Sequence, residues 1–294
     1  MRIIILTLFM IVPLLANAEV VDGIAYNLDK EAKTAEVARN DYSGALTVPS
    51  SITVEGVEYA VTSIGYAAFE YCTGLTSVDI PNSVTNIGNR AFHDCTGLTS
   101  VNLGNSVKNI GWGAFYGCNA LTKVTMPETV SDMTIGGCAF SSCSGLTSIT
   151  VPQSVSEIGV GAFGHCYRLT SASIPESLTN VGKYAFRDCN AMTQVYCSAT
   201  EVPSTADNVF FNIDVAKSTL YVPQASIEAY KAASPWKDFG NILAIEASAI
   251  ADVKIGDAGV SAIYTLDGKH ATDGSRGILI VRQADGTTKK VLKP

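Results

Sequence analysis

The sequence is poor in the residues and motifs on which enzymes usually depend. It holds three histidines, His93, His165 and His270, among 294 residues. It has no Cys-x-x-Cys pair of the kind that structural zinc sites favour, no Gly-x-Ser-x-Gly and no Walker sequence. Residues 159–164 match the Gly-x-Gly-x-x-Gly fingerprint of dinucleotide sites, but they coincide with a structural repeat. We therefore expect no catalytic residue, no cofactor, no bound metal and no enzymatic activity.

Basic charge is also scarce. Charged residues make up 16% of the chain, and 20 Lys and Arg stand against 27 Asp and Glu, which gives a formal net charge of −7. An acidic chain is repelled by polyanions such as nucleic acid and by anionic lipid surfaces. We expect no nucleic-acid partner. The sequence contains no signal for a particular oligomeric state.

Long hydrophobic runs are absent except at the start of the chain. The run IIILTLFMIVPLL follows Arg2 and precedes three small-residue positions at 16–18, an order that is typical of a signal peptide. We predict a signal peptide over residues 1–18 and export to the cell surface or the extracellular space; a buried N-terminal strand or helix is the alternative. No later run approaches the roughly 20 apolar residues that a membrane span needs. The mature chain is therefore expected to contain no membrane span.

What the sequence does contain is a repeat. An Ala-Phe pair followed three residues later by Cys occurs six times, and consecutive Phe residues are 23, 23, 25, 23 and 23 positions apart. The six Phe residues are Phe69, Phe92, Phe115, Phe140, Phe163 and Phe186. A fixed period of this length indicates supersecondary units that stack and share one core.

Each repeat contains three apolar stretches. In one copy, LTSVDIP (residues 75–81) alternates as a half-buried strand does and ends at a proline. SVTNIG (83–88) is a second inward-pointing stretch, and GYAAFEYC (65–72) predicts a single helical or 3-10 turn with Ala, Phe and Cys on one side. Parallel strands stack roughly 4.8 Å apart. We predict a parallel solenoid with a strand face and a turn-rich face over residues 64–200, with a bulge near residues 131–136 in the 25-residue repeat.

The segments that flank the repeats differ from them. Residues 19–63 are predicted to form an N-terminal β cap with a hairpin that turns at Glu55-Gly56. Residues 201–246 are interpreted as a degenerate repeat and a C-terminal helical cap, with Ile227 and Tyr230 on one helix face. Residues 247–294 hold three short alternating segments and predict a small β module.

The repeat frame I-G-x-x-A-F-x-x-C-x-x-L-x-x-V-x-I-P resembles the BspA-like leucine-rich repeats of bacterial surface proteins. The resemblance covers roughly residues 22–246 and includes the cap TLYVPQASIEAYKAA. It implies a leucine-rich-repeat solenoid and an exported, non-enzymatic protein that binds macromolecules in an adhesion-like role.

The C-terminal module has a resemblance of its own. YTLDGK (264–269) and GILIVR (277–282) are similar to the Y-x-L-x-G-K and G-x-x-I-V-R signatures of type IX secretion sorting modules. This implies export across an outer membrane and attachment at the surface. A small β domain or an additional cap without a sorting role is the alternative.

The eight cysteines are predicted to be reduced. Six of them occupy one column of the repeat, where equivalent side chains point inward in parallel, whereas a disulfide needs Cβ atoms that face each other. Buried free cysteine behaves as a small apolar residue. Cys197 falls on a core position as well, and Cys138, outside the column, is expected to be the most exposed thiol.

Aromatic residues gather beside the Ala-Phe turns. Aromatic side chains dominate interaction hot spots and also stack on sugars, while the strand positions that face outward are mostly small and polar. We predict that partner-binding residues lie on the turn side; the candidates are Tyr66, Tyr71, Trp112, Tyr116 and Tyr167. The expected partners are proteins, with glycans or a purely structural role in the envelope as alternatives. A further reading is that several of these rings only shield the neighbouring turns.

Overall fold

The computed structural model describes residues 18–127, 130–206 and 208–245, and the backbone of three strands at 260–265, 277–283 and 288–293. The predicted signal peptide lies outside the described residues except for Ala18.

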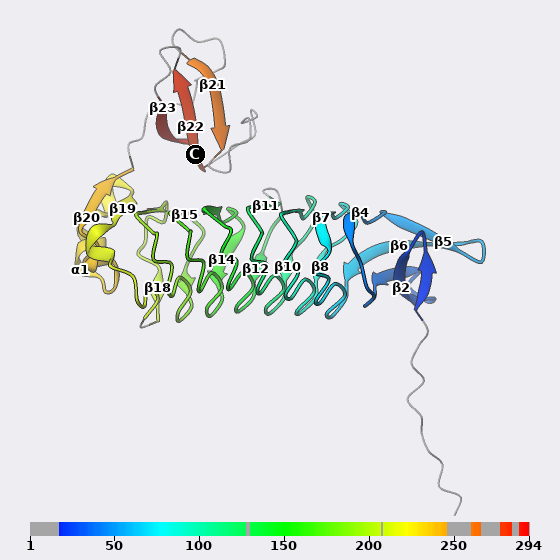
Figure 1. The fold of residues 1–294 in the computed structure, drawn as a ribbon. Coiled ribbons are helices and arrows are strands. Elements are labelled where there is room, and N and C mark those ends of the chain that lie inside the picture. The colour runs from blue at the N-terminus through cyan, green and yellow to red at the C-terminus, as the bar shows by residue number, and fades with distance from the viewer. Residues whose placement is uncertain are drawn as a thin grey trace, which may run out of the picture.

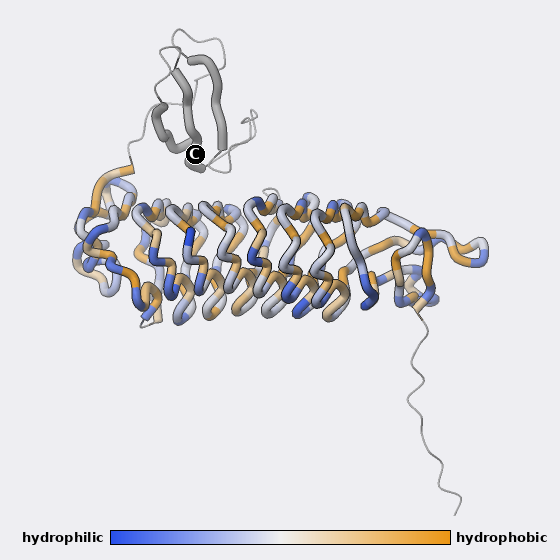
Figure 2. The backbone as a smooth tube through the Cα atoms, viewed as in Figure 1, coloured by the Kyte–Doolittle hydropathy of each residue, from blue (hydrophilic) through white to orange (hydrophobic). Residues whose placement is uncertain are grey.

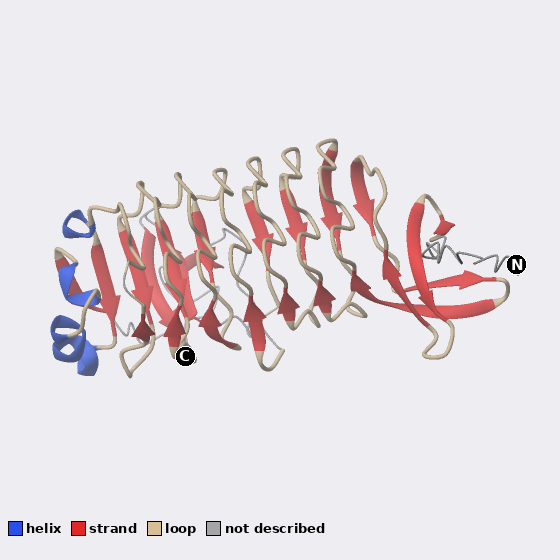
Figure 3. Ribbon diagram, turned by 90° about the horizontal axis from the view of Figure 1, so that it is seen from below, coloured by secondary structure: helices blue, strands red, loops and turns tan. Residues whose placement is uncertain are grey.

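The chain winds into a parallel β-solenoid of about nine turns (Figure 1). The predicted solenoid fold is confirmed, and the solenoid has more turns than the six repeats of the sequence. Figure 3 shows the strands of successive coils side by side, with helices at one end of the stack only. Each regular coil contributes one strand to each of two rows and a turn between them.

The first strand row is an eleven-stranded sheet. Along this sheet, β3, β6 and the even-numbered strands from β8 to β18 pair in parallel with one another. At the N-terminal end the pairs β1–β2, β2–β3 and β5–β6 are antiparallel. The strands are β1 (Glu19–Val21), β2 (Ile24–Asp29), β3 (Thr34–Val37), β5 (Ser51–Val54), β6 (Val57–Ile64), β8 (Asn86–Ile87), β10 (Asn109–Ile110), β12 (Met133–Ile135), β14 (Val155–Ile158), β16 (Asn180–Val181) and β18 (Ser204–Thr205).

The second strand row consists of two parallel sheets that are separated between β11 and β13. One sheet contains β4 (Gly44–Thr47), β7 (Leu75–Asp79), β9 (Ser100–Asn102) and β11 (Lys123–Thr125). The other contains β13 (Ser148–Thr150), β15 (Ser171–Ile174), β17 (Gln194–Cys197), β19 (Thr219–Val222) and β20 (Asn241–Ala244). The separation falls in the 25-residue repeat. The pairing of β12 with β14 shifts register between Met133 and Ile135, but the additional residue lies on β14, since Val155 and Ile158 are three positions apart and Met133 and Ile135 are two. The bulge predicted near residues 131–136 is therefore not confirmed by this shift.

The turns that join the first row to the second form a continuous edge, which we call the turn edge (residues 65–74, 88–97, 111–120, 136–145, 159–168 and 182–191). Each is a pair of tight turns rather than a helix. The Cys72 N–H donates to the Phe69 carbonyl at 3.0 Å, but Ala67 and Tyr71 have φ values of 53° and 63°, which no right-handed helix contains. The Phe69 N–H donates to the Ala91 carbonyl of the next coil at 2.7 Å. Backbone hydrogen bonds therefore connect the turns of adjacent coils, as they connect the strands of adjacent coils.

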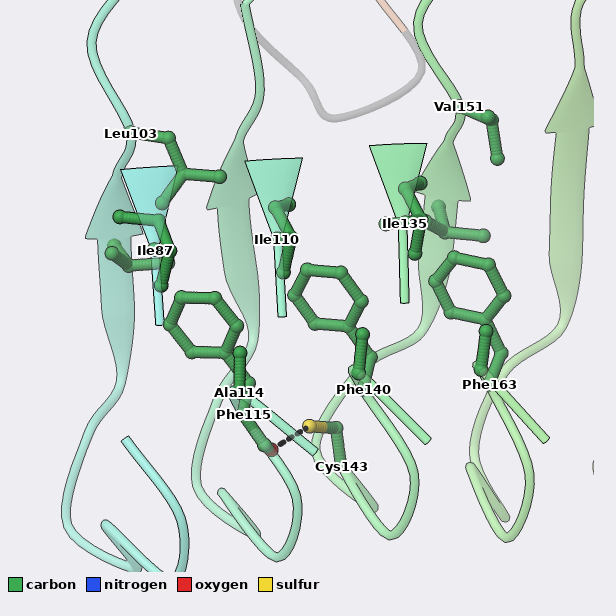
Figure 4. Packing of buried hydrophobic residues seen from close by; sticks show 14 of the residues in the cluster. Ile87, Leu103, Ile110, Ala114, Phe115, Ile135, Phe140, Cys143, Val151 and Phe163 are labelled. Carbon is green, nitrogen blue, oxygen red and sulfur yellow. Dashed lines mark hydrogen bonds between the residues drawn. The ribbon is translucent and has the colours of Figure 1, made fainter. Parts of the chain in front are cut away.

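The Phe residues of the repeat form a ladder through the core (Figure 4). Adjacent rings from Phe69 to Phe186 lie 4.7 to 5.6 Å apart between centroids and within 13° of parallel. A seventh ring, Phe210, continues the ladder at 5.8 Å. The Ala-Phe pattern did not reveal it, because Val209 stands where Ala stands in the other coils.

Both ends of the ladder are closed. Tyr42 packs on Phe69 with a centroid distance of 4.7 Å, and Trp236 and Phe239 meet Phe210 edge-on at 5.5 and 5.1 Å. At the C-terminal end α1 (Ile227–Ala232) places Tyr230 fully buried against Trp236. The single-turn helices η1 (Val215–Lys217), η2 (Gln224–Ser226) and η3 (Trp236–Asp238) flank it.

A glycine column sets how closely the coils approach. A Cβ added to Gly88, Gly111, Gly136, Gly159 or Gly182 would lie 2.6 to 2.8 Å from the carbonyl carbon of the matching glycine one coil earlier. Real Cβ atoms do not approach backbone this closely. The invariant Gly of the repeat frame is therefore required by contact between coils.

The repeat cysteines are free thiols inside the core, as predicted. Five of them donate an S–H hydrogen bond to the Phe carbonyl of the preceding coil; Cys143, for example, donates to Phe115 at 3.0 Å (Figure 4). Cys197 is buried too, 3.1 Å from the Tyr230 hydroxyl, and Cys138 is the one cysteine that is only partly buried. Burial raises the pKa of the Cys118 thiol well above its usual range.

Outside the regular coils, two predicted β elements appear. β5 and β6 form an antiparallel hairpin whose two-residue loop is Glu55-Gly56, with φ values of 52° and 79°. The C-terminal module contains β21 (Val260–Thr265), β22 (Gly277–Gln283) and β23 (Thr288–Lys293) in one antiparallel sheet. Within the described part of the chain, no helix combines the length and the apolar character that crossing a membrane requires.

Figure 2 shows that apolar positions recur at the same place in successive coils and so form lines along the solenoid. These lines are the repeat's Leu, Val, Ile, Ala, Phe and Cys positions, and they belong to one continuous buried cluster from Ile24 to Phe239. The outer positions are thereby free to vary, and they carry the candidate site.

Candidate recognition surface

The turn edge presents large aromatic side chains to solvent. Tyr66, Tyr71, Trp112 and Tyr167 are between 51% and 64% exposed, although their neighbours Ala68, Phe69 and Cys72 are buried. Left-handed residues such as Ala67 and Tyr71 reverse the chain direction twice in each turn. Ala67 is buried, whereas Tyr71 points away from the core. All four of these aromatics were candidates from the sequence; the fifth, Tyr116, is half-buried.

Three rings of the turn edge join into what we call the aromatic row, Tyr71–His93–Tyr116. The Tyr71 ring meets His93 edge-on at 5.9 Å, and His93 stacks on Tyr116 at 4.8 Å and 14°. The row crosses three consecutive coils. His93 is also held by Asp94, whose carboxylate lies 3.0 Å from its Nδ1 atom. Tyr116 is half-buried because His93 covers one of its faces.

Tyr66 and Trp112 flank the aromatic row without ring contact to it among the described residues. They occupy the same repeat position, two coils apart, with Asn89 between them. The Asn89 side-chain oxygen accepts a hydrogen bond from the Trp112 backbone N–H at 2.8 Å. The Trp112 indole lies beside Gly137 of the next coil, since a Cβ added there would be 3.2 Å from its Cδ1 atom. Gly137 thus leaves room for an exposed indole.

A buried carboxylate fixes the turn that carries Tyr71. The Glu70 side chain is 5% exposed and pairs with Arg39 at 3.1 Å and with Arg90 of the next coil. Buried charges are tolerated when they are paired in this way. The Tyr71 end of the aromatic row therefore rests on an ion-paired support and not on a flexible loop.

Tyr167 belongs to a second cluster further along the turn edge. Its hydroxyl lies 3.3 Å from Nδ1 of His165, and the same nitrogen lies 3.1 Å from Asp188 of the next coil. Asp188 also accepts hydrogen bonds from Asn212 at 2.6 Å and from Arg187 at 2.8 Å. The Asn212 donation and the Arg187 and His165 charges hold the pKa of the Asp188 carboxyl below its usual range.

Sequence reasoning missed one cluster on this edge. Arg187 lies over both Tyr184 and Phe211, at 5.4 and 5.3 Å from the ring centroids, and Lys183 lies 4.8 Å from the Tyr184 centroid. Phe211 is 45% exposed. It sits in the coil of Val209-Phe210, which follows the last coil of the turn edge and lacks the Ala-Phe signature, so its place beside the turn edge was not predicted. The sequence did contain a signal for this coil. Phe210 follows Phe186 by 24 positions, close to the repeat spacing, and Phe211 is the next residue.

The second strand row has a different surface. A shallow hollow of about 310 Å³ crosses β7, β9 and β11. Its lining is small and polar apart from two valines and one lysine: Val78, Asp79, Ser100, Val101, Asn102, Lys123 and Thr125. Among the described residues, no aromatic side chain lines it. The turn edge therefore offers the richer contact surface of the two.

Within the described residues, no three His, Cys, Asp or Glu side chains are grouped so as to hold a metal ion. The His165–Asp188 pair of the turn edge is hydrogen-bonded to Tyr167, Asn212 and Arg187, whereas His93 and Asp94 are in ion-pair contact.

Comparison with known proteins identifies the family to which the chain belongs. The model for the BspA type leucine-rich repeat region, with six copies, matches residues 50–134 and 131–231, which is more than half of the chain. No curated protein matches the chain.

Several solved structures are similar to it, among them two leucine-rich proteins. A leucine-rich cell surface protein from Faecalibacterium prausnitzii is 26% identical with a TM-score of 0.55, and the match covers 92% of this chain and 60% of that one. The T. pallidum leucine-rich repeat protein is 31% identical with a TM-score of 0.54, over 58% of this chain and 78% of that one. The chain thus spans about 60% of the length of the F. prausnitzii protein.

Proposed function

The chain belongs to the BspA-type leucine-rich repeat family, and from this premise we propose that it is an exported recognition protein at the cell surface. It has no catalytic role, and it binds a macromolecular partner through the turn edge in an adhesion-like manner.

The observation that carries this proposal is the contrast between the two surfaces. Large exposed rings gather on the turn edge, whereas the outward positions of β7, β9 and β11 are small and polar. Tyr and Trp are the residues most enriched at binding hot spots, because they bury a large area at a small cost in conformational entropy. Solenoids supply the rigid extended support that such surfaces need.

A protein is the partner that we favour. The rings run along one edge over several coils, and the charged groups Arg39, Arg90 and Arg187 lie among them. Aromatic and arginine side chains together are the usual composition of a protein interface. A glycan, which also stacks on exposed rings, and a purely structural role in the envelope are the alternatives that the test must separate.

Export is supported by the two ends of the sequence. Residues 1–18 have the organisation of a signal peptide, and residues 247–294 resemble a type IX sorting module and contain the three-stranded sheet β21–β23. We propose the division into a signal peptide (1–18), an N-terminal cap (19–63), a solenoid (64–200), a C-terminal cap (201–246) and a sorting module (247–294). The F. prausnitzii relative is itself described as a cell surface protein.

The partner class is tested with residues 19–294 as a purified protein. It is presented to immobilised host extracellular-matrix proteins and, separately, to a glycan array. We expect saturable binding to at least one protein and none to the glycans. Binding to glycans alone would replace the protein partner with a glycan, and no binding in either format would favour the structural role.

Export is tested in the native host with and without residues 247–294. The complete chain should be degraded when intact cells are treated with protease, whereas the chain without the module should be protected inside the envelope. Equal degradation of both chains would contradict a sorting role for the module.

A further inference from the structure

The outward surface of the second strand row changes character along the solenoid. Asp79, Asn102 and Thr150, which face outward from β7, β9 and β13, are exposed. The side chains in the corresponding positions of the next two strands are not: Ser173 on β15 is 6% exposed and Tyr196 on β17 is 5% exposed. Ser171, also on the outward side of β15, is 8% exposed.

Neighbouring strands do not account for this burial. The Tyr196 ring stacks on Tyr221 of β19 at 4.6 Å and 7°, which covers one of its faces. Its other neighbour in the row is Ser173, whose side chain is too small to cover a phenol ring. Burial, with the nearby Tyr221 as a second cause, also raises the pKa of Tyr196. The Tyr196 hydroxyl also donates a hydrogen bond to Gln194 of the same strand at 3.2 Å, but this contact is at the end of the ring. The second face of the ring, which is 5% exposed overall, is therefore covered from outside the sheet.

The chain that follows β20 can provide the cover. β20 ends at Ala244, and the strands of its sheet follow the order β15-β17-β19-β20. β15 therefore lies three strand spacings, roughly 14 Å, from β20. The 14 residues from 246 to 259 can span about 46 Å when extended, which is ample for a return across these strands. In Figure 1, β21–β23 lies on the side of the solenoid that carries β15 and β19.

We propose that the outward surface of β15, β17 and β19 is the intramolecular docking site for the C-terminal three-stranded sheet β21–β23. Charge favours this arrangement, since residues 264–294 hold six Lys and Arg against three Asp and Glu while the chain as a whole is acidic. The docked module closes the C-terminal half of the second strand row and leaves the turn edge open. When the module is engaged elsewhere, the Tyr196–Tyr221 stack becomes accessible.

The test measures hydroxyl-radical oxidation of Tyr196 by mass spectrometry in residues 19–294. Ser171→Arg places a long charged side chain under the docked module; the repeat itself tolerates such a side chain, because Lys123 occupies the same position on β11. The matched control is Ser100→Arg on β9. We expect Tyr196 oxidation to be several times lower than that of Tyr66 in the unmodified chain, to rise several-fold in Ser171→Arg and to stay unchanged in Ser100→Arg.

A chain that ends at residue 245 gives an independent measurement. Among the described residues, all members of the buried core cluster lie between Ile24 and Phe239, so the described core is retained in the shorter chain. Tyr196 oxidation should rise several-fold in this shorter chain, while Tyr66 and Tyr71 remain as they were. Oxidation of Tyr196 at the level of Tyr66 in the complete chain, or no increase after removal of the module, would overturn the proposal.

Discussion

Phe115 shows how one repeated residue becomes a structural contact. Its ring lies between those of Phe92 and Phe140, at 4.8 and 5.1 Å, and none of it is exposed. Phe115→Ala removes contacts to two coils at once and leaves a cavity that the hydrogen-bonded coils cannot close. We expect a loss of about 3–5 kcal/mol in the free energy of unfolding, measured by urea denaturation.

The adjacent Tyr116 is the matched control for this variant. It has one stacked partner and is half-buried, so Tyr116→Ala should cost about 1 kcal/mol or less. Equal losses for the two variants would mean that the Phe ladder is not the main stabilising contact between these coils.

The cysteine column makes a prediction about reactivity. Burial raises the pKa values of Cys118 and Cys143, and only the thiolate reacts with alkylating reagents. At pH 8 we expect iodoacetamide to modify Cys138 first and the other seven cysteines only on unfolding, as followed by mass spectrometry. Disulfide-linked peptides between consecutive repeat cysteines, or rapid modification of all eight in the folded chain, would be inconsistent with the thiol column.

The raised pKa values of the buried thiols lower the stability of the protein at alkaline pH. The folded thiols stay neutral, whereas thiols of the unfolded chain ionise near their ordinary pKa of about 9.0. Ionisation stabilises the unfolded state. The contribution of the neutral buried thiols to the free energy of unfolding is therefore complete below pH 9 and is lost as the pH rises further. The melting temperature should therefore fall between pH 9 and 10 by more than it does in a Cys118→Ala variant of the chain.

At the scale of the element, the closeness of the coils depends on the glycine column. A Cβ on Gly111 would lie 2.6 Å from the backbone nitrogen of Asn89 and 2.7 Å from the carbonyl carbon of Gly88. Both atoms belong to the previous coil and cannot move aside without breaking its hydrogen bonds. Gly111→Ala should destabilise the protein by about 1–3 kcal/mol in urea denaturation, as overpacking of a core does.

Gly164 offers a control in a neighbouring part of the turn edge. The nearest atom to a Cβ built there is the Gly161 carbonyl oxygen at 3.3 Å, and the others are 3.6 Å away. Gly164→Ala should cost clearly less than Gly111→Ala. The opposite order would show that coil spacing is not set by the glycine column.

The elements themselves were predictable to different degrees. The coils, the Glu55-Gly56 hairpin and the capping helix followed from periodicity and turn chemistry, because these act over a few residues. The left-handed residues of the turn edge, such as Arg90 and Asp94, were not predicted. Their conformations are fixed by hydrogen bonds to the next coil, as when Arg90 donates its N–H to Trp112, and no local propensity encodes those bonds.

At the scale of the whole molecule, the repeat predicted the solenoid but not its surfaces. Exposure of Tyr66, Tyr71 and Trp112 could be anticipated, because they stand between the core positions of the repeat. The stacking of His93 on Tyr116 depends on rotamers in two coils, and the burial of Tyr196 depends on a cover from outside the sheet. Neither is contained in the spacing of residues along the chain.

The central claim is that the turn edge binds the partner. The most direct measurement is the dissociation constant of the matrix protein captured in the binding panel for residues 19–294 and for two double variants. Trp112→Ala with Tyr116→Ala removes rings of the turn edge, and Asn102→Ala with Lys123→Ala alters the exposed second strand row as the matched control. We predict that the aromatic pair weakens binding at least tenfold, while the melting temperature falls by only a few degrees and the control pair binds as the unmodified chain does. Loss of binding in the control pair, with the aromatic pair unaffected, would contradict the account.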